Sequence, residues 1–368
     1  AMFYTGLAQA IGEKVVHIFG TGENSLMLGL MLVGTALSSV LSNTGTCACL
    51  MPVALGICAA SKNTASRQLL PMAYACGWGG IITLVGTPPN IIGSGALTAA
   101  GLPGFSFFEF AWIGIPLSVA GILYMLLIGK YLLPKAELDA DQEIEQEIEA
   151  TTHDKKKQVI SGVILLACVT VMALNLKFIS LEMTAIIGAL VCVLTGCLTE
   201  KQAYSSIDWV TIFLFAGMMP VSTAMDKTGA GKLIANWAVG LMGGEPTPLI
   251  VTIVLFSISC FLTQFMSNTA SAALLCPIGI AIAKQLNADP KAVVMAIAVA
   301  ASCAFATPVG TPPCTLVLGP GGYKFMDYVK CGTGLVLLCR RGNMIRMKVL
   351  TAYNMLYFLA PGRMKSVL

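Results

Sequence analysis

Long runs without a charged residue dominate the pattern of hydrophobic and polar positions along this chain. One membrane-spanning helix needs about 20 predominantly apolar residues. Runs of that length occupy residues 110–129, 158–176, 183–199 and 209–225. Longer runs, interrupted by small polar residues, glycine and proline, occupy residues 25–60, 68–108, 246–283 and 292–323. The pattern therefore predicts an all-α polytopic membrane protein whose longer runs each contain a break.

Two of the longer runs share a motif near their centres. Ser-Asn-Thr occupies residues 42–44 and again residues 267–269, with a proline ten positions after the serine in both copies. A second shared motif, Val-Gly-Thr-Pro-Pro, follows at residues 85–89 and 309–313. The asparagine of the first motif and the threonine of the second are 44 positions apart in one copy and 43 in the other. This matched order and spacing indicates an internal repeat.

Both motifs predict breaks at membrane depth. Ser, Asn and Thr favour helix N-termini, so Ser-Asn-Thr can end one half-helix and begin the next, which gives a re-entrant helical hairpin. Gly-Thr-Pro-Pro predicts a broken helix, because glycine permits unusual backbone angles and proline removes a donor. A single Ser-Asn-Thr is more often a surface turn or a polar contact between helices. Its duplication at matched spacing favours the hairpin, and inverted repeats with broken helices are typical of secondary transporters.

The repeat divides the chain into four parts: a first repeat at 1–134, a charged cytoplasmic linker at 135–157, a second repeat at 158–330 and a divergent basic tail at 331–368. The first repeat is expected to hold an arm helix, a hairpin at 25–60, a broken helix at 71–95 and a span at 107–133. The second is expected to hold spans at 158–176, 183–199 and 209–225, a hairpin at 246–283 and a broken helix at 292–323.

Comparison of the two copies also predicts incomplete ends. The second copy has three spans before its hairpin, whereas the first begins at Ala1 without an initiator methionine. After Cys331 only a short uncharged run precedes Arg340. We therefore expect amino-terminal spans to be missing and the segment after about residue 330 to be aberrant. In that case the chain would be a non-functional fragment of a carrier.

Composition excludes several functional classes. Hydrophobic residues make up 56% of the chain and charged residues 11%, and the mean hydropathy is +0.81, far from the usual globular composition. The thirteen cysteines are scattered without a spacing that suits zinc. No Asp, Glu or His lies in a predicted span near the motifs. A soluble enzyme, an intramembrane enzyme, a nucleic-acid-binding protein and a disulfide-rich secreted domain are therefore poor fits, and we expect no enzymatic cofactor.

The paired motifs resemble those of the divalent anion:sodium symporter family, which carries dicarboxylates, citrate or sulfate. The resemblance covers residues 1 to about 330. It implies a multi-pass protein of the cell membrane that forms a homodimer. It also implies symport of a small divalent anion with sodium as the coupling ion, by elevator-type alternating access.

The resemblance also implies site residues. A first sodium ion would be held by Ser38, Ser42, Asn43 and the carbonyl of Gly86. A second would be held by Thr263, Asn268 and the carbonyls of Met266 and Gly310. The anion would contact Asn43, Thr44, Thr87, Pro88, Asn268, Thr269, Thr311 and Pro312. In the second copy Cys314 replaces Asn90, which removes a polar group that could line that half of the site.

Two other transport mechanisms stay open at this stage. A proton-coupled or arsenite-like permease with similar hairpins is the main alternative, and sodium-dependent uptake separates it from a sodium symporter. A channel would also place polar groups at the midplane, but its flux would not saturate.

Overall fold

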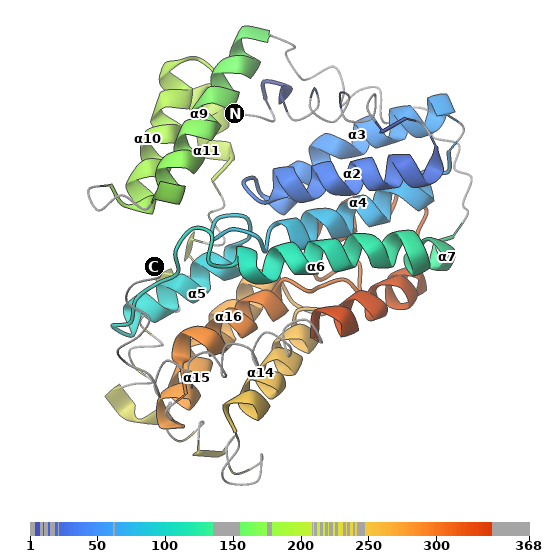
Figure 1. Cartoon of the computed structure of the whole chain (residues 1–368). Helices are drawn as coiled ribbons and strands as arrows, with labels where there is room; N and C mark the ends of the chain where they lie inside the picture. Colours follow the sequence, from blue (N-terminus) through green and yellow to red (C-terminus); the bar gives the residue numbers. More distant parts are fainter. Residues whose placement is uncertain are drawn as a thin grey trace, which may run out of the picture.

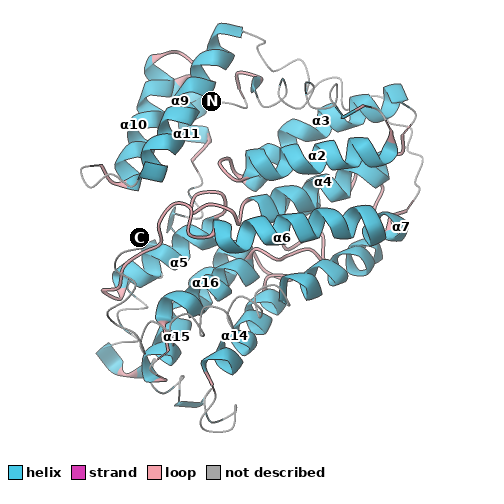
Figure 2. Ribbon diagram, viewed as in Figure 1, coloured by secondary structure: helices cyan, strands magenta, loops and turns pink. Residues whose placement is uncertain are grey.

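The computed structural model of the chain describes residues 22–61, 63–134, 155–174, 179–207, 247–286 and 288–340, with isolated positions in 4–20 and 209–240. Helices connected by turns and loops build this described part, and no strand occurs in it (Figures 1 and 2). The expected arm helix, most of the expected span at 209–225, the linker over 135–154 and the tail over 341–368 lie outside the described residues.

The first half of the fold is a helical hairpin followed by an interrupted helix. Helix α2 (Glu23–Ser38) and helix α3 (Asn43–Ser61) are joined by residues 39–42 and pack against each other. Helix α4 (Ala65–Gly79) packs on both. Helix α5 (Pro88–Ala99) follows after a non-helical segment. It starts at the proline pair because proline fits the first turn of a helix, where no internal donor is needed.

The second half repeats this order of elements. Helices α14 (Pro248–Leu262) and α15 (Asn268–Gln285) form the hairpin, and α16 (Pro290–Ala301) and α17 (Pro312–Leu316) flank a non-helical segment. The backbone angles agree at the two breaks: Thr87 has φ −143° and ψ 141°, and Thr311 has φ −144° and ψ 136°. The sequence repeat is therefore also a repeat of local structure.

The two halves interlock through their interrupted helices. Helix α5 packs against α15 and α16 of the other half (Figure 1), and α17 packs against α3 and α4. At the centre, the Tyr74 hydroxyl donates to the Phe305 carbonyl at 2.8 Å, and the two rings meet edge to face. Tyr323 donates to the Ser66 carbonyl at 2.5 Å. The breaks in both halves are thus buried within one shared core.

The remaining described helices carry the longest apolar stretches. Helix α6 (Ala111–Tyr124) continues through a π-helical turn, η1 (Met125–Gly129), into α7 (Lys130–Leu132). Helices α9 (Lys155–Leu174), α10 (Leu181–Leu194) and α11 (Glu200–Ser205) follow. Two continuous helices in the described part, Ala111–Leu132 and Lys155–Leu174, are long and apolar enough to cross a membrane.

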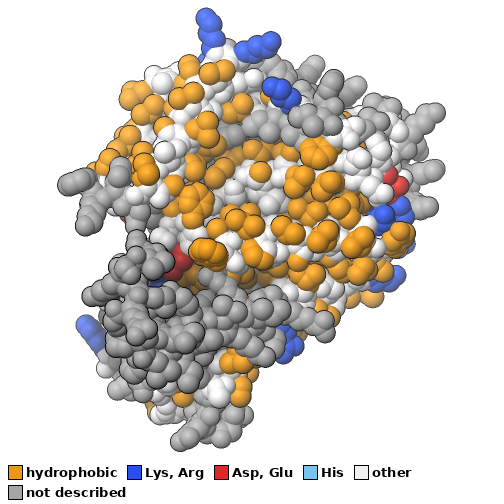
Figure 3. Space-filling model, in the orientation of Figure 1, with side chains coloured by type: hydrophobic (Ala, Val, Ile, Leu, Met, Phe, Trp, Pro, Cys, Tyr) orange, Lys and Arg blue, Asp and Glu red, His pale blue; other side chains and the backbone are white. Residues whose placement is uncertain are grey.

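An apolar face covers one side of the molecule. On α6 and η1, apolar side chains at three- and four-residue intervals are exposed, namely Trp112, Ile115, Val119, Leu123 and Leu127. Figure 3 shows hydrophobic side chains spread across this face, with most of the charged ones toward its edges. A lipid environment would cover such a face at no cost in buried polar groups.

Two helices cross predicted boundaries. Residues 325–340 form one helix, so the division at residue 331 cuts through an element. Its buried side carries Cys331, Leu335 and Cys339 at intervals of four, and Gly332 lets it approach the Phe305 carbonyl. The charge of Lys330 interrupts the apolar run and hides this helix in the sequence. Helix α9 likewise begins inside the predicted linker, with three lysines in its first turn.

Candidate cation and anion site

A cluster of polar oxygen groups lies at the turn of the first hairpin. Ser38 ends α2, Asn43 begins α3, and both side chains are buried. The Ser38 hydroxyl lies 2.7 Å from Asn43 Oδ1 and 2.7 Å from the Cys76 carbonyl oxygen. The side-chain amide atom of Asn43 that faces Ser38 also lies 3.0 Å from the Cys76 carbonyl oxygen and 3.1 Å from the Gly86 carbonyl oxygen. One hydroxyl, one amide and two carbonyls, from α2, α3, α4 and the segment before α5, therefore meet at this turn.

The second hairpin builds the same cluster. Thr263 Oγ1 lies 2.8 Å from Asn268 Oδ1 and 2.6 Å from the Ala301 carbonyl oxygen. The side-chain amide atom of Asn268 that faces Thr263 also lies 3.1 Å from the Ala301 carbonyl oxygen and 2.9 Å from the Gly310 carbonyl oxygen. Each cluster thus consists of one hydroxyl, one amide and two carbonyls, and the duplication extends from the sequence to the contacts.

The chemistry of these clusters suits a small hard cation. Oxygen ligands without a titratable side chain bind such ions through lone pairs, and unwound backbone carbonyls serve sodium in this way in secondary transporters. Cys76 lies in the last turn of α4, and Ala301 is the last residue of α16. Carbonyls at a helix C-terminus carry the negative end of the helix dipole, which adds to the attraction for a cation.

Two hydroxyls fix the interrupted segments against the hairpin turns. Thr83 Oγ1 donates to the Ser39 carbonyl in the first half, and Thr307 Oγ1 donates to the Gln264 carbonyl at 2.5 Å in the second. Gly86 is required for the close approach, because a Cβ there would lie 2.5 Å from the Gly80 carbonyl oxygen. The non-helical segment of each half thus sets the position of one carbonyl in its cluster, that of Gly86 or Gly310.

Two of the residues expected to hold sodium, Ser42 and Met266, lie in the hairpin turns beside the clusters. The Ser42 hydroxyl accepts a hydrogen bond from the Gly45 amide at 3.1 Å, and Ser267 accepts one from Ala270 at 3.2 Å, as N-terminal caps of α3 and α15. Met266 lies half-buried in the second turn. The roles of Ser42 and Met266 at sodium stay predictions.

Sequence reasoning missed the carbonyls of Cys76 and Ala301. A carbonyl is present at every residue, so no side-chain pattern marks one as a ligand. The only available signal is position: each precedes the interrupted segment of its repeat by a few residues.

The residues expected to contact the anion lie at four helix N-termini. Thr44 and Pro312 are exposed, Pro88 and Thr269 are half-buried, and Thr87 and Thr311 are buried. These helix starts carry partial positive charge, which favours an anion, but α5 and α17 each begin with two prolines, which have no N–H to donate. A cross-repeat contact brings α17 to α3, where Cys47 Sγ lies 3.7 Å from the Pro313 carbonyl. One anion touching all of these residues stays a prediction.

Asn90 lies beside Gly80, the residue that adjoins the Asn43 amide. It is fully buried, and its amide nitrogen donates to the Thr83 carbonyl at 2.8 Å inside its own segment. Cys314, at the corresponding position, lies 4.0 Å from the Ala304 carbonyl. The expectation that Cys314 removes a polar group from the second half-site stays a prediction.

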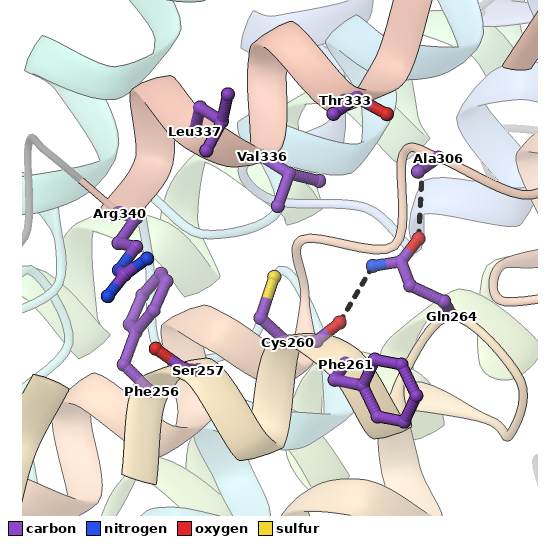
Figure 4. A pocket seen from close by; sticks show the side chains of 10 residues that line it. All are labelled: Phe256, Ser257, Cys260, Phe261, Gln264, Ala306, Thr333, Val336, Leu337 and Arg340. Atoms are coloured by element: carbon purple, nitrogen blue, oxygen red, sulfur yellow. Dashed lines mark hydrogen bonds between the residues drawn. The ribbon is translucent and has the colours of Figure 1, made fainter. Parts of the chain in front are cut away.

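A mainly apolar cavity of about 240 Å³ adjoins the second cluster (Figure 4). It lies between α14 and the helix 325–340, with Phe256 and Phe261 on one side and Val336 and Leu337 on the other. Gln264 forms part of its wall, donating to the Cys260 carbonyl at 2.8 Å and accepting from the Ala306 amide at 3.0 Å (Figure 4). None of the predicted anion-binding residues lines this cavity.

Comparisons with known proteins agree on one family. The sequence matches the citrate transporter family over residues 1–271, with a second, overlapping match over 171–366. An uncharacterized transporter of Haemophilus influenzae is 34% identical over 358 residues, which cover 92% of this chain and 76% of that protein. The sodium-dependent dicarboxylate transporter SdcS of Staphylococcus saprophyticus is 24% identical, over 98% of this chain and 74% of that protein.

A solved structure shares the fold. The crystal structure of the YdaH transporter of Alcanivorax borkumensis superposes with a TM-score of 0.60 at 15% identity, covering 96% of this chain and 84% of that one. At this identity the likeness concerns the fold alone. From the sequence matches, the chain belongs to the citrate transporter family of membrane transporters, which are not enzymes, and the predicted resemblance to the divalent anion:sodium symporters is confirmed.

Proposed function

We propose that this chain is a sodium-coupled symporter of small divalent anions, with a dicarboxylate as the first candidate. The duplicated oxygen cluster at Asn43 and Asn268 carries the proposal, because two such clusters can each hold one coupling ion. A relative named as a sodium-dependent dicarboxylate transporter supports both the ion and the substrate class. Citrate and sulfate are the alternative dianions.

The ligands in the clusters favour sodium over protons. A proton-coupled carrier needs a group that gains and loses a proton, usually a carboxylate or an imidazole. Each cluster consists of a Ser or Thr hydroxyl, an Asn amide and two backbone carbonyls. None of these groups titrates near neutral pH, whereas all of them bind a small metal cation.

The anion would be attracted by helix dipoles and by the bound cations together. No Lys or Arg lies within the Ser-Asn-Thr or Gly-Thr-Pro-Pro motifs. A helix N-terminus supplies roughly half an elementary charge, so the dipoles at the site are a weak match for a dianion by themselves. Two sodium ions next to Asn43 and Asn268 would supply the remaining positive charge, and transport of the anion would then depend on sodium.

The proposed transport cycle moves both clusters together. Residues 39–42 and 263–267 would form the tips of re-entrant hairpins, and the two repeats would be inverted with respect to the bilayer. The interlocking of α5 with α15 and of α17 with α3 ties both clusters into one body. Such a body can move across the membrane against a scaffold in an elevator-type cycle, with a homodimer as the assembly.

Uptake under separate ion gradients tests the proposed function. The chain is reconstituted into lipid vesicles and supplied with labelled succinate, citrate or sulfate, under an inward sodium gradient or an inward proton gradient. We expect saturable uptake of a dianion in the sodium gradient alone. Uptake driven by protons without sodium would support the alternative permease, and non-saturating flux would support a channel.

A further inference from the structure

The side chain of Gln264 connects the second hairpin to the interrupted segment between α16 and α17, residues 302–311. It is buried, and its amide nitrogen donates to the Cys260 carbonyl at 2.8 Å and to the Cys303 carbonyl at 2.9 Å. Its amide oxygen accepts from the Ala306 N–H at 3.0 Å (Figure 4). Two carbonyls and one backbone N–H fix the orientation of this amide, because only its nitrogen can donate and only its oxygen can accept.

The backbone of Gln264 holds the same segment nearer to its other end. Its carbonyl oxygen accepts from Thr307 Oγ1 at 2.5 Å, and Thr307 Oγ1 accepts from the Gly310 N–H at 3.3 Å. Thr263, the preceding residue, supplies the hydroxyl of the second cluster. One residue of the hairpin turn therefore holds the segment that separates the two carbonyls of this cluster, those of Ala301 and Gly310.

The first repeat connects its hairpin to its interrupted segment less extensively. Ser39 lies three positions before Ser-Asn-Thr, as Gln264 does in the second repeat. The Ser39 carbonyl accepts from Thr83 Oγ1, which corresponds to the bond from Thr307 to Gln264. The Ser39 hydroxyl, however, donates to the Ala36 carbonyl of its own helix at 2.7 Å. The bonds that the Gln264 side chain makes across to the segment thus have no counterpart from Ser39.

Asn90 supplies an amide to the interrupted segment of the first repeat instead. Its nitrogen donates to the Thr83 carbonyl at 2.8 Å and lies 3.5 Å from the Gly80 carbonyl oxygen. Cys314 occupies this position in the second repeat, and its thiol lies 4.0 Å from the carbonyl oxygen of Ala304, which corresponds to Gly80. A thiol is a weak donor with one proton, whereas an amide nitrogen donates two. The second segment therefore lacks a strong donor at this position.

We infer that Gln264 is the positioning residue of the second cation cluster and takes the role that Asn90 has in the first repeat, an inference that rests on the proposed function. The amide comes from the hairpin turn in one repeat and from the following helix in the other. Gln264 acts through residues 302–311, because its amide atoms are bonded to Cys260, Cys303 and Ala306. Carbonyls that are held in place before a cation arrives lose less conformational freedom on binding, which raises the affinity.

Hydrogen exchange of the interrupted segment tests the positioning role without any cation. The full chain is reconstituted into lipid vesicles in choline chloride and transferred to D2O, and mass spectrometry follows peptides that cover residues 302–311. Gln264→Met keeps a side chain of similar length and removes the amide. We expect this variant to exchange about tenfold faster in these peptides, as a segment does when its hydrogen bonds open. Gln264→Asn draws the amide back by one methylene and should show the same effect to a smaller extent.

A second substitution tests the equivalence with Asn90. Adding Cys314→Asn to Gln264→Met places an amide at the position that corresponds to Asn90. We expect it to restore slow exchange over residues 302–311, at least in part. Exchange that stays as fast as in Gln264→Met would show that an amide at this position does not replace Gln264.

Gln68 provides the matched control. It is a buried glutamine of α4 whose amide nitrogen donates to the Glu23 carbonyl of α2 at 3.1 Å, outside both clusters. Gln68→Met removes a buried amide between two helices in the same way. It should lower the thermal stability of the chain and leave the exchange of residues 302–311 as in the wild type. Equal acceleration in Gln68→Met and Gln264→Met would show a general loss of stability and overturn the inference.

Succinate binding at increasing sodium concentrations then tests the effect on the cluster. In Gln264→Met we expect the midpoint sodium concentration to rise about tenfold, because the second cluster is no longer held in place. Succinate affinity in saturating sodium should stay close to that of the wild type, since the role of Gln264 concerns the cation. A wild-type midpoint in Gln264→Met would overturn its role at the cluster.

The outcomes separate this inference from the proposed function. If residues 302–311 exchange at the wild-type rate in both Gln264 variants, Gln264 does not position the segment, and the symporter proposal stands as long as wild-type succinate binding needs sodium. If the exchange accelerates and Cys314→Asn restores it, but wild-type succinate binding is the same in choline, Gln264 positions the segment and the symporter proposal is wrong.

Discussion

In the proposed function Asn43 and Asn268 each combine two kinds of recognition in one side chain, since an amide can supply an oxygen to a cation and N–H groups to an anion. Their partners are a hydroxyl from the preceding helix and two carbonyls from the broken helix. All of these groups are uncharged. The selectivity of each cluster therefore rests on where the lone pairs point.

Replacing the amide by a carboxylate should separate the two roles. We expect Asn43→Asp to keep or raise sodium affinity, because it keeps an oxygen in the cluster and adds negative charge. The same variant should lower succinate affinity tenfold or more, as it loses the N–H groups and repels the anion. Asn24→Asp adds the same charge at an exposed position and serves as the control. Isothermal calorimetry measures both ligands. Wild-type succinate affinity in Asn43→Asp would contradict the shared role.

Removing one hydroxyl tests the cluster itself. Ser38→Ala takes away a proposed sodium ligand and the donor to the Cys76 carbonyl, at a cost of about 1 to 3 kcal/mol for a buried acceptor left without its partner. We expect sodium affinity to fall about tenfold. Ser118→Ala is the matched control, because that buried hydroxyl donates to the Gly114 carbonyl in α6, outside both clusters. Equal losses in the two variants would show a general effect on stability.

The sequence can predict site residues that act through their side chains, but not those that act through backbone carbonyls. Asn43 and Asn268 lie in a duplicated motif, whereas Ser38 and Thr263 are suggested only by the resemblance to the divalent anion:sodium symporters. The carbonyls of Cys76 and Ala301 cannot be predicted, because the path of the backbone, and not the residue type, brings them to the cluster. The Ser42 hydroxyl caps α3, a contact that its residue type at a helix start predicts, and its role at sodium stays a prediction.

At the scale of elements, the breaks between α4 and α5 and between α16 and α17 position the clusters. Charge-free length, caps and the Gly-Thr-Pro-Pro motifs predict both hairpin segments and both interrupted helices close to their observed bounds. The helix 325–340 was not predicted, because Lys330 divides its apolar residues and its core contacts depend on distant segments. Local patterns thus identify the breaks, but they do not reveal what packs around them.

A glycine at the first break offers an element-scale test. Gly80 has helical backbone angles, φ −61° and ψ −20°, so alanine is compatible with the chain path there. Its methyl group would displace the Asn43 amide, and we expect Gly80→Ala to weaken sodium binding by tenfold or more. Gly56→Ala in α3 meets open space and should bind sodium as the wild type does. Unchanged sodium binding in Gly80→Ala would mean that the amide does not need this space.

At the scale of the whole molecule, two halves share one core and present an apolar face. The Tyr74 and Tyr323 hydroxyls bond to carbonyls of the other half, and α5 and α17 each pack into the opposite half. Both clusters are therefore parts of one body. Along α6 and η1 the exposed apolar stripe from Trp112 to Leu127 gives this body a face that suits lipid.

A charge on that stripe tests its contact with lipid. Leu123 is 51% exposed near the middle of the apolar helix Ala111–Leu132. In a bilayer, Leu123→Arg should cost about 3 kcal/mol at the membrane centre and reduce the fraction of chain recovered in membranes. Leu123→Ala is the control and should be recovered normally. Full recovery of the arginine variant would show that α6 does not face lipid there.

The central claim, that two cation clusters make anion binding depend on sodium, is tested most directly by calorimetric titration of succinate, citrate and sulfate into the reconstituted chain. In sodium chloride we expect saturable binding of at least one of these dianions, and in choline chloride none. Asn43→Ala and Asn268→Ala should each abolish the binding, since each leaves one cluster without its amide. Equal affinity in sodium and choline, or wild-type binding in both variants, would contradict the account.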